Sequence, residues 1–374
     1  MKSNEIINLS FTEGDYPVPQ PIEKITNNSE DMVVFGEGNL FPNDVKDIIE
    51  NTSLLSTILD KVTKYVYAGG IDADYSQMIV NDKGTTFEEL VYDSIYDFLG
   101  YGAFAIQVRR NALKDIKKLD HLRIERIRVN EDNNKIFYHK KWSKYAKANL
   151  VYDAFAGVDA KEQSDSIFYF KDSNRHIYGF ANWWSSLTDA KVLQSLSDYN
   201  IHSVENAFLG SCVISLCEGK PSDDEAKQVE KKLQEKFAGT KNAGKILVTF
   251  SDSKDSTPEI TNLTPTDLNA CYLSLQQTSI DNLFNAFCLD PILIGRHPDT
   301  GIFSETAYKE AFDLYYATTV KPTQQKIIKA GLHSRRTRGD RHSSRVEAKN
   351  PALLSNRDGY LLELTGWTQG SQAS

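Results

Sequence analysis

Long apolar runs are absent from the 374-residue chain, and no stretch approaches the roughly 18 consecutive apolar residues of a membrane-spanning helix. Residues 1–20 also lack the apolar segment of a secretory signal peptide. The two absences predict a protein that is made in a cytoplasm, stays there and has no membrane partner.

Cysteine is scarce, with four residues in the whole chain: Cys212, Cys217, Cys271 and Cys288. None belongs to a C-x-x-C pair, and none has a histidine at the spacing of a zinc site. The pattern predicts reduced, buried thiols. We therefore expect no structural metal and no cofactor.

Positive charge is also in short supply, because 43 Lys and Arg face 51 Asp and Glu for a net charge of −8. This balance argues against tight, sequence-reading DNA binding and is compatible with DNA that passes without sticking. Residues 331–374 are the exception, with seven Lys and Arg against four Asp and Glu. The arginines at 335–345 could contact phosphates, but a solvated segment is the favoured interpretation.

Catalytic motifs are missing as well. The stretch Gly239–Lys245 nearly matches a phosphate-binding loop, but Ile246 replaces the Mg²⁺-binding hydroxyl. A helix is expected before the glycines and a strand after them, so no helix N-terminus would face a phosphate. The acidic pairs Glu88–Glu89 and Asp223–Asp224 fall in the first turns of predicted helices, where carboxylates favour the helix dipole.

The periodicity predicts an α+β protein. Helices are expected after Pro42, over residues 55–66 and over residues 87–99, each with an apolar stripe. Strand-like stretches follow at 103–108, 122–129, 135–142 and 165–170, which suggests an antiparallel sheet.

Two long helices dominate the second half, over residues 185–208 and 267–287. Their apolar stripes are narrow, which favours packing against neighbouring helices over burial in a globular core. Between them lies a small strand–helix–strand module at 211–262. A further helix is expected from Ser304 to Val320, where Pro322 should interrupt it.

Four motifs stand in a recognisable order. They are residues 36–59 (GEGNLFPNDVKDIIENTSLLSTIL), Tyr178-Gly179 with Trp183-Trp184, the Gly239–Gly244 turn, and the Phe287–Gly295 stretch with Ser304–Ala307 after it. Together they resemble the HK97-type phage portal family, in particular its short members from Bacteroidetes phages and prophages. The resemblance covers roughly residues 30–330. Ala181 departs from it, standing where the family usually has proline.

The resemblance implies an elongated portal subunit with an α/β wing, a two-helix stem, a small β-α-β clip and a short C-terminal crown-like segment. Clip strands of the family pair between subunits. The implied parts are an arm (1–30), the wing (31–184), stem helices (185–210 and 263–289), the clip (211–262), a tunnel loop (290–304), a wing or tunnel helix (305–330) and a crown or tail (331–374).

The implied function is structural, with no chemistry of its own. The subunit would form a ring of twelve copies at the capsid vertex, through which double-stranded DNA passes non-specifically during packaging and ejection. The implied partners are the terminase large subunit, a head–tail adaptor and the major capsid or scaffolding protein. The protein would be assembled in the host bacterial cytoplasm and would reside in the virion.

The resemblance also implies site residues. Those of the tunnel loop, which would face the DNA, are Arg296, His297, Asp299, Thr300 and Gly301. Those of the clip, which would dock the motor or the connector, are Glu218, Lys220, Lys241 and Asn242.

Two other functions stay open at this point. One is an enzyme of the metal-dependent nuclease or phosphotransferase type, which would use the acidic clusters and would need several carboxylates to converge on metal ions. The other is a different head–tail structural protein, such as an adaptor. Two long helices that flank an inserted module favour a portal over an adaptor.

Overall fold

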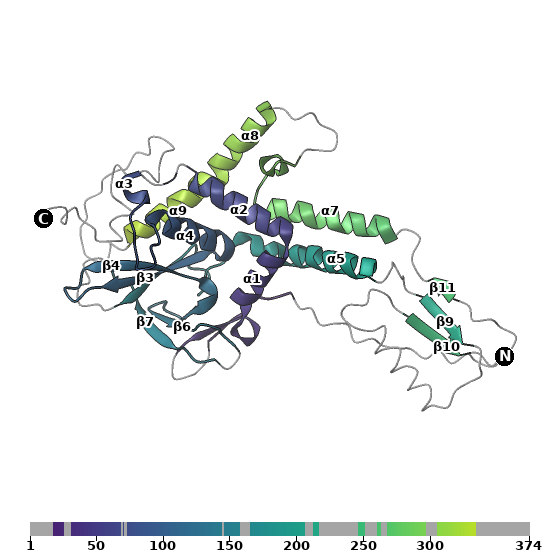
Figure 1. The fold of residues 1–374 in the computed structure, drawn as a ribbon, viewed down its shortest axis with the longest axis horizontal. Coiled ribbons are helices and arrows are strands. Elements are labelled where there is room, and N and C mark those ends of the chain that lie inside the picture. The colour runs from purple at the N-terminus through teal and green to yellow at the C-terminus, as the bar shows by residue number, and fades with distance from the viewer. Residues whose placement is uncertain are drawn as a thin grey trace. The chain divides into compact units, whose positions relative to one another are not determined.

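The computed structural model describes residues 18–25, 31–68, 70, 73–143, 146–157, 165–205, 212–216, 246–250, 260–262, 268–296 and 305–333 (Figure 1). The chain divides into two compact units. We call residues 19–187 and 282–374 the body, and residues 1–18 and 188–281 the helix-pair unit. Each unit is described by itself.

The body begins with the short antiparallel strands β1 (Glu23–Ile25) and β2 (Val33–Phe35), a 3₁₀ turn η1 (Glu37–Asn39) and helices α1 (Phe41–Asn51) and α2 (Ser53–Tyr67). Pro42 lies in the first turn of α1, where its missing N–H costs nothing. The expected apolar stripes of both helices are buried, and they are Val45, Ile48, Ile49, Leu55, Ile58, Leu59, Val62 and Val66.

Helix α4 (Phe87–Tyr101) follows the single-turn helix α3 (Ala73–Ser76) and has well-defined ends. At its start the Thr86 hydroxyl accepts from the Glu89 N–H at 3.2 Å, while the Glu89 carboxylate accepts from the Thr86 N–H at 2.8 Å. At its end Gly102 has a φ of 70° and lies against the backbone of Phe180, where a side chain would collide. The end of α4 is therefore fixed by a close backbone approach.

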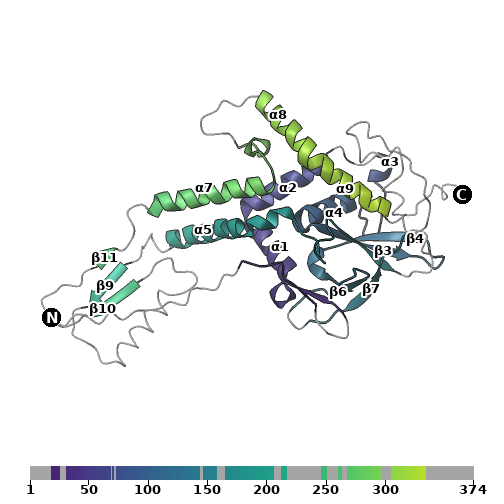
Figure 2. The same cartoon turned by 180° about the vertical axis from the view of Figure 1, so that it is seen from behind.

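The central sheet of the body has six strands in the order β4-β3-β8-β7-β6-β5. All neighbours are antiparallel except β7 and β8, which are parallel. Helices α2, α4 and α9 lie on the same side of it (Figures 1 and 2). The strands are β3 (Ala103–Arg110), β4 (Ile116–Leu122), β5 (Ile127–Val129), β6 (Lys135–Tyr138), β7 (Leu150–Ala154) and β8 (Ser166–Lys171), with the 3₁₀ turn η2 (Ile124–Arg126) before β5.

This sheet confirms the α+β class and corrects two details. Strand β4 begins at Ile116, so the expected stretch at 122–129 is the end of one strand, a 3₁₀ turn and a second strand. Strand β7 was not expected, because Leu150 and Val151 are half exposed and the strand shows no apolar alternation. It joins the sheet through its neighbours.

A fully buried arginine of β5, Arg128, bonds to the turn η1. Arg128 donates from Nε to Asn39 Oδ1 at 2.7 Å and from its terminal nitrogens to the carbonyl oxygens of Asn39 at 2.5 Å and Ile127 at 2.6 Å. Its guanidinium also lies 5.2 Å from the Trp142 ring centroid. Burial lowers the pKa of Arg128 to about 10, so it stays charged and is stabilised by carbonyl dipoles.

The Tyr178 and Trp183-Trp184 motif forms an aromatic anchor of the body. The Tyr178 hydroxyl donates to the Val33 carbonyl at 2.5 Å, and its ring stacks on Phe35 at 4.1 Å. Both indole N–H groups of Trp183 and Trp184 donate to the Gly100 carbonyl at 3.1 Å. The two tryptophans lie in the 3₁₀ turn η3 (Asn182–Ser186), just before the first long helix.

The helix-pair unit contains most of α5 (Leu187–Glu205) and α7 (Leu268–Ala286), which confirms the two long helices. It also holds three short strands, β9 (Cys212–Leu216), β10 (Ile246–Phe250) and β11 (Ile260–Asn262). The helix expected within the module at 211–262 lies outside the described residues.

The last elements of the body are the 3₁₀ turn η4 (Pro291–Ile294), α8 (Glu305–Tyr315), a π-helical turn η5 (Tyr316–Val320) and α9 (Lys321–His333). The expected stop at Pro322 is wrong, because the helical path continues into α9. The π turn widens the backbone just before the proline, where the Lys321 N–H bonds to the Tyr316 carbonyl. Pro322 then occupies the first turn of α9, a position that tolerates its missing N–H.

The expected burial of the thiols is also wrong where it can be checked. Cys271 and Cys288 are both free and exposed. Cys217 lies outside the described residues. No helix among the described residues is long and apolar enough to cross a bilayer.

Candidate functional site

The paired helices are the first candidate region. Helices α5 and α7 run side by side in both views (Figures 1 and 2), and the rings of Tyr199 and Tyr272 meet at a centroid distance of 5.1 Å. Among the described side chains of the helix-pair unit, only Ala190 and Ser279 are buried. The helices therefore have almost no apolar core of their own in the part of the unit that is described.

Apolar side chains on this helix pair are instead exposed. Ile201 on α5 is 55% exposed, and Leu273 and Leu275 on α7 are 66% and 43% exposed. Several apolar groups on one pair of helices form a surface that a neighbouring protein can cover. The two helices with narrow apolar stripes are thus confirmed, and apolar side chains on their sides are exposed.

The three strands of the same unit form a small sheet in the order β10-β9-β11. Strands β9 and β10 are parallel, with Cys212 opposite Ile246 and Leu216 opposite Phe250, and β11 is antiparallel to β9. The resemblance implied pairing between subunits, but in this structure the strands pair within one chain.

The turn after α7 is the second candidate region, and it lies in the body. Asp290 caps η4 by accepting from the Ile292 N–H at 2.9 Å, and Gly295 ends it with a φ of 84°. The Arg296 N–H then donates to the Pro291 carbonyl at 3.1 Å. The exposed Arg296 guanidinium lies 5.8 Å from the Phe284 ring centroid, so the turn gives this side chain a defined position.

Tyr65 of α2 holds the elements on both sides of residues 297–304. Its hydroxyl donates to the Leu293 carbonyl at 2.7 Å and lies 3.2 Å from the Tyr308 hydroxyl. Its ring also contacts Phe312 at 5.6 Å and Tyr315 at 6.0 Å. Burial and the neighbouring Tyr308 raise the pKa of Tyr65 above its usual value, so the hydroxyl remains a hydrogen-bond donor at neutral pH.

Of the nine residues predicted for the site, Arg296 alone lies in the described part of the chain. The other eight (His297, Asp299, Thr300, Gly301, Glu218, Lys220, Lys241 and Asn242) lie outside it, as do the Gly239 turn and the arginines at 335–345. Sequence reasoning missed Tyr65, because it sits beside the apolar stripe of α2 and nothing in the pattern marks its hydroxyl.

A part-buried contact between a histidine and a carboxylate was also missed. The His121 Nε2 and Asp97 Oδ2 atoms lie 2.8 Å apart, with Asp93 4.0 Å from the other ring nitrogen. Burial lowers the pKa of His121, but the bond to Asp97 and the nearby carboxylates raise it more, so that the net shift is upward. No group of three His, Cys, Asp or Glu side chains that could hold a metal occurs among the described residues. Glu89 of the Glu88–Glu89 pair caps α4, and Glu88 accepts from the Tyr67 hydroxyl at 2.6 Å.

A model of the phage portal protein family matches residues 79–348, which is well over half of the chain. The chain therefore belongs to the phage portal protein family. The search of curated proteins found no match.

Several solved structures are similar to the chain at low identity. An HK97 family phage portal protein from Corynebacterium diphtheriae is 12% identical, with 76% of this chain and 88% of that chain covered and a TM-score of 0.46. A chain in the virion of a native gene transfer agent particle is 15% identical over 77% of this chain and 79% of that one, with a TM-score of 0.48. A chain in the neck of such a particle, computed with C12 symmetry, is 17% identical over the same shares, with a TM-score of 0.48.

Proposed function

We propose that the protein is the structural subunit of a ring channel at the capsid vertex, through which double-stranded DNA enters the head and later leaves it. Family membership supports the class of protein. The observation that supports the ring is the exposure of Ile201, Leu273 and Leu275 on the helix pair. The helix pair of a neighbouring copy would cover these side chains. A closed ring satisfies this need for every copy, because each subunit offers one flank to the next.

Within this proposal, each segment of the chain corresponds to a part of a portal subunit. The body up to Trp184 is the wing, α5 and α7 are the stem, and the strands β9, β10 and β11 belong to the clip. The turn at Pro291–Ile294 and the residues after it form the tunnel loop, and α8 continues from it. Residues 331–374 complete the chain as a crown or tail.

Arg296 is the residue of the proposed tunnel loop that the geometry supports best. It is exposed, and its position is set by η4 and by the Phe284 ring. A cation at this point would make a local, transient contact with a phosphate, whereas the acidic chain as a whole (net charge −8) keeps DNA from sticking. His297, Asp299, Thr300 and Gly301 would share the surface of the loop.

The proposed partners follow from the same assignment. Glu218 and Lys220 come shortly after β9 in the sequence, and Lys241 and Asn242 come shortly before β10. These residues would dock the terminase motor during packaging and the head–tail adaptor afterwards. The wing would contact the capsid or scaffolding protein, with assembly in the bacterial cytoplasm and the final location in the virion.

The helix-pair surface offers a direct test of the proposal. Changing both Leu273 and Leu275 to Glu should convert rings into monomers, because two charges per subunit would be buried at every contact. The thermal unfolding temperature of the body should not change. Leu113→Glu is the control for a charge placed on exposed apolar surface of the body, since Leu113 is 79% exposed at the turn between β3 and β4. Mass photometry that finds the control and the double variant in the same oligomeric state contradicts the proposed role of α7.

A further inference from the structure

The loop between β6 and β7, residues 139–149, carries charge of one sign only. It contains four lysines and no Asp or Glu, in a chain whose net charge is −8. The side chains of Lys140, Lys141 and Lys147 are exposed, and none of them forms an ion pair with a carboxylate among the described residues. The loop, which we call the lysine loop, is therefore a patch of positive charge that the described part of the chain leaves unpaired.

A buried tryptophan fixes the lysine loop on the body. Trp142 packs with Met32 and Phe137 in one apolar cluster. The Lys140 N–H also donates to Asn149 Oδ1 at 3.4 Å, which joins the two ends of the loop. Because Trp142 is turned inward, the exposed lysines project from a loop whose position is already set, and little ordering remains when a ligand binds.

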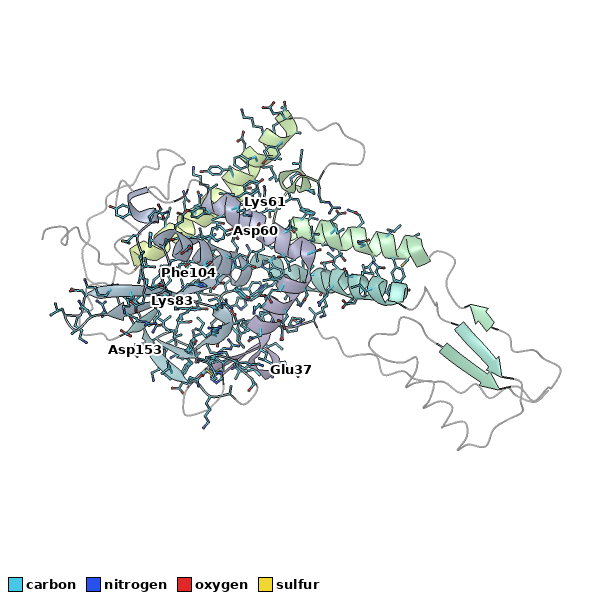
Figure 3. All side chains as sticks on the ribbon, in the orientation of Figure 1. Glu37, Asp60, Lys61, Lys83, Phe104 and Asp153 are labelled. Atoms are coloured by element: carbon cyan, nitrogen blue, oxygen red, sulfur yellow. The ribbon has the colours of Figure 1, made fainter. Side chains whose placement is uncertain are left out.

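Arginines from a second segment lie beside the lysine loop. The His139 N–H donates to the Arg126 carbonyl at 3.0 Å, so η2 runs along the start of the loop. Arg123, just before η2, is 58% exposed, and its guanidinium lies 3.9 Å from the buried Glu125. Asp153 lies near the other end of β7, about 10 Å along the strand from its first residue (Figure 3). The positive patch therefore extends over two segments of the chain.

The chemistry of this patch fits the phosphates of a nucleic acid duplex better than an acidic protein surface. Lysine ammonium groups are point charges without a fixed direction, which suits contacts to a phosphate backbone that do not read sequence. A protein partner would also need apolar surface at the centre of the contact. Leu150 and Val151 are half exposed next to the loop, but successive residues of a strand point to opposite faces, so the two form no joint apolar patch.

We propose that the lysine loop, with Arg123 and Arg126 beside it, binds the phosphate backbone of duplex DNA without regard to sequence. The site is separate from Arg296, because β6 and β7 lie on the far side of the body from α8 in both views (Figures 1 and 2). About three or four phosphate contacts give weak, salt-sensitive binding, which agrees with the acidic balance of the whole chain. This inference does not rest on the channel function, since it needs neither a ring nor the tunnel loop.

Acetylation of lysines on the unmodified full-length protein tests the proposal. A duplex of about 30 base pairs, in about 50 mM salt, should slow the acetylation of Lys140, Lys141 and Lys147 about threefold or more, as measured by mass spectrometry of peptides. Lys114 and Lys117 are exposed at the opposite edge of the sheet and should react equally fast with and without DNA. Acetylation of the loop lysines that DNA leaves unchanged would overturn the proposal.

A pair of charge-reversal variants measures how much the loop contributes to binding. Changing Lys140, Lys141 and Lys147 together to Glu should weaken binding of the same duplex about tenfold or more in fluorescence anisotropy. The plot of log affinity against log salt concentration should become shallower by about 3, because about three phosphate contacts are lost. The control makes the same change at three exposed lysines elsewhere on the body, Lys114, Lys117 and Lys321. It should bind within about twofold of the unmodified chain.

The two variants carry the same net charge, so their comparison separates a local contact from a general charge effect. Equal losses of affinity in both would overturn the proposal. Unmodified protein that binds poly-L-glutamate but not the duplex would assign the patch to an acidic protein, and this result would overturn it too. Thermal unfolding of both variants should match the unmodified chain, since all six side chains are exposed.

Discussion

The body and the helix-pair unit differ in where their apolar side chains lie. The body buries whole stripes of α1, α2 and α4 against a six-stranded sheet, and even encloses a charged Arg128. In the described part of the helix-pair unit only Ala190 and Ser279 are buried, while Leu273 on α7 is 66% exposed. The difference teaches that the body has an apolar core of its own, whereas the described part of the helix pair leaves apolar side chains exposed, which in the proposed ring would be covered by neighbouring copies.

The largest effect is expected inside the body. Arg128→Ala removes the donors for the two oxygens of Asn39 and the carbonyl of Ile127, and should cost about 3 kcal/mol of unfolding free energy. Urea unfolding followed by tryptophan fluorescence measures it. Arg123→Ala is the control, since that side chain is 58% exposed and its loss should cost less than about 0.5 kcal/mol. Similar losses in both variants would show that the buried hydrogen bonds of Arg128 stabilise the body no more than an exposed side chain does.

A second pair of variants tests the aromatic anchor just before α5. Trp183→Phe loses the indole N–H that donates to the Leu99 and Gly100 carbonyls, and should cost about 1–2 kcal/mol. Trp142→Phe is matched in volume, but its buried N–H has no hydrogen-bond partner among the described residues, so its cost should be smaller. Thermal unfolding of the two variants side by side gives the difference, and a larger loss for Trp142→Phe would contradict the anchor.

The same chemical change can be made in both regions. Tyr65→Phe removes the hydroxyl that joins Leu293 to α2 and should cost about 1 kcal/mol. Tyr272→Phe on α7 should leave the unfolding of the body unchanged within about 0.5 kcal/mol, because the Tyr272 hydroxyl is bonded to Tyr199 within the helix-pair unit. Chemical denaturation of both variants checks the prediction. If the two losses are equal, the tyrosine hydroxyls do not distinguish the regions.

The smallest effect is a pH dependence confined to the body. Burial and the bond to Asp97 act in opposite directions on His121, and the net result is a pKa above the model-peptide value of about 6.5. A raised folded-state pKa gives stability that is complete below about pH 6.5 and is lost as the pH rises through the folded pKa. Burial also raises the pKa of Asp97, which gives the same sign.

Unfolding curves between pH 6 and pH 8.5 should therefore show the body losing on the order of 1 kcal/mol or less as the pH rises. His121→Asn should flatten this slope, because the titrating group is gone. A slope that persists unchanged in His121→Asn would show that other groups carry it.

The sequence predicted most helices because the spacing of apolar residues that marks a helix lies within the helix itself. The stripes at Val45–Ile49 and Leu55–Val66, the helix expected over residues 87–99 and the two long helices all appear close to the expected bounds. What the pattern missed depends on distant partners. Strand β7 is held by its neighbours in the sheet. The buried Arg128 donates a hydrogen bond to a side-chain oxygen of Asn39, 89 residues away.

The candidate site was harder to predict than the fold. Arg296 could be named only through the family resemblance of the Phe287–Gly295 stretch, whereas the role of Tyr65 depends on a carbonyl 228 residues further along the chain. The stop at Pro322 was wrong because a π turn, which leaves no mark in the sequence pattern, absorbs the proline. The free thiols are exposed because Cys271 lies on an exposed face of α7 and Cys288 lies in the turn after that helix.

The central claim is that contacts between copies complete the helix pair. Two-dimensional class averages of the purified full-length protein in electron microscopy test it most directly. We predict closed rings of twelve subunits with α5 and α7 packed between neighbours. A stable monomer at concentrations at which the unmodified chain should assemble, with Leu273 still open to solvent, would contradict the account.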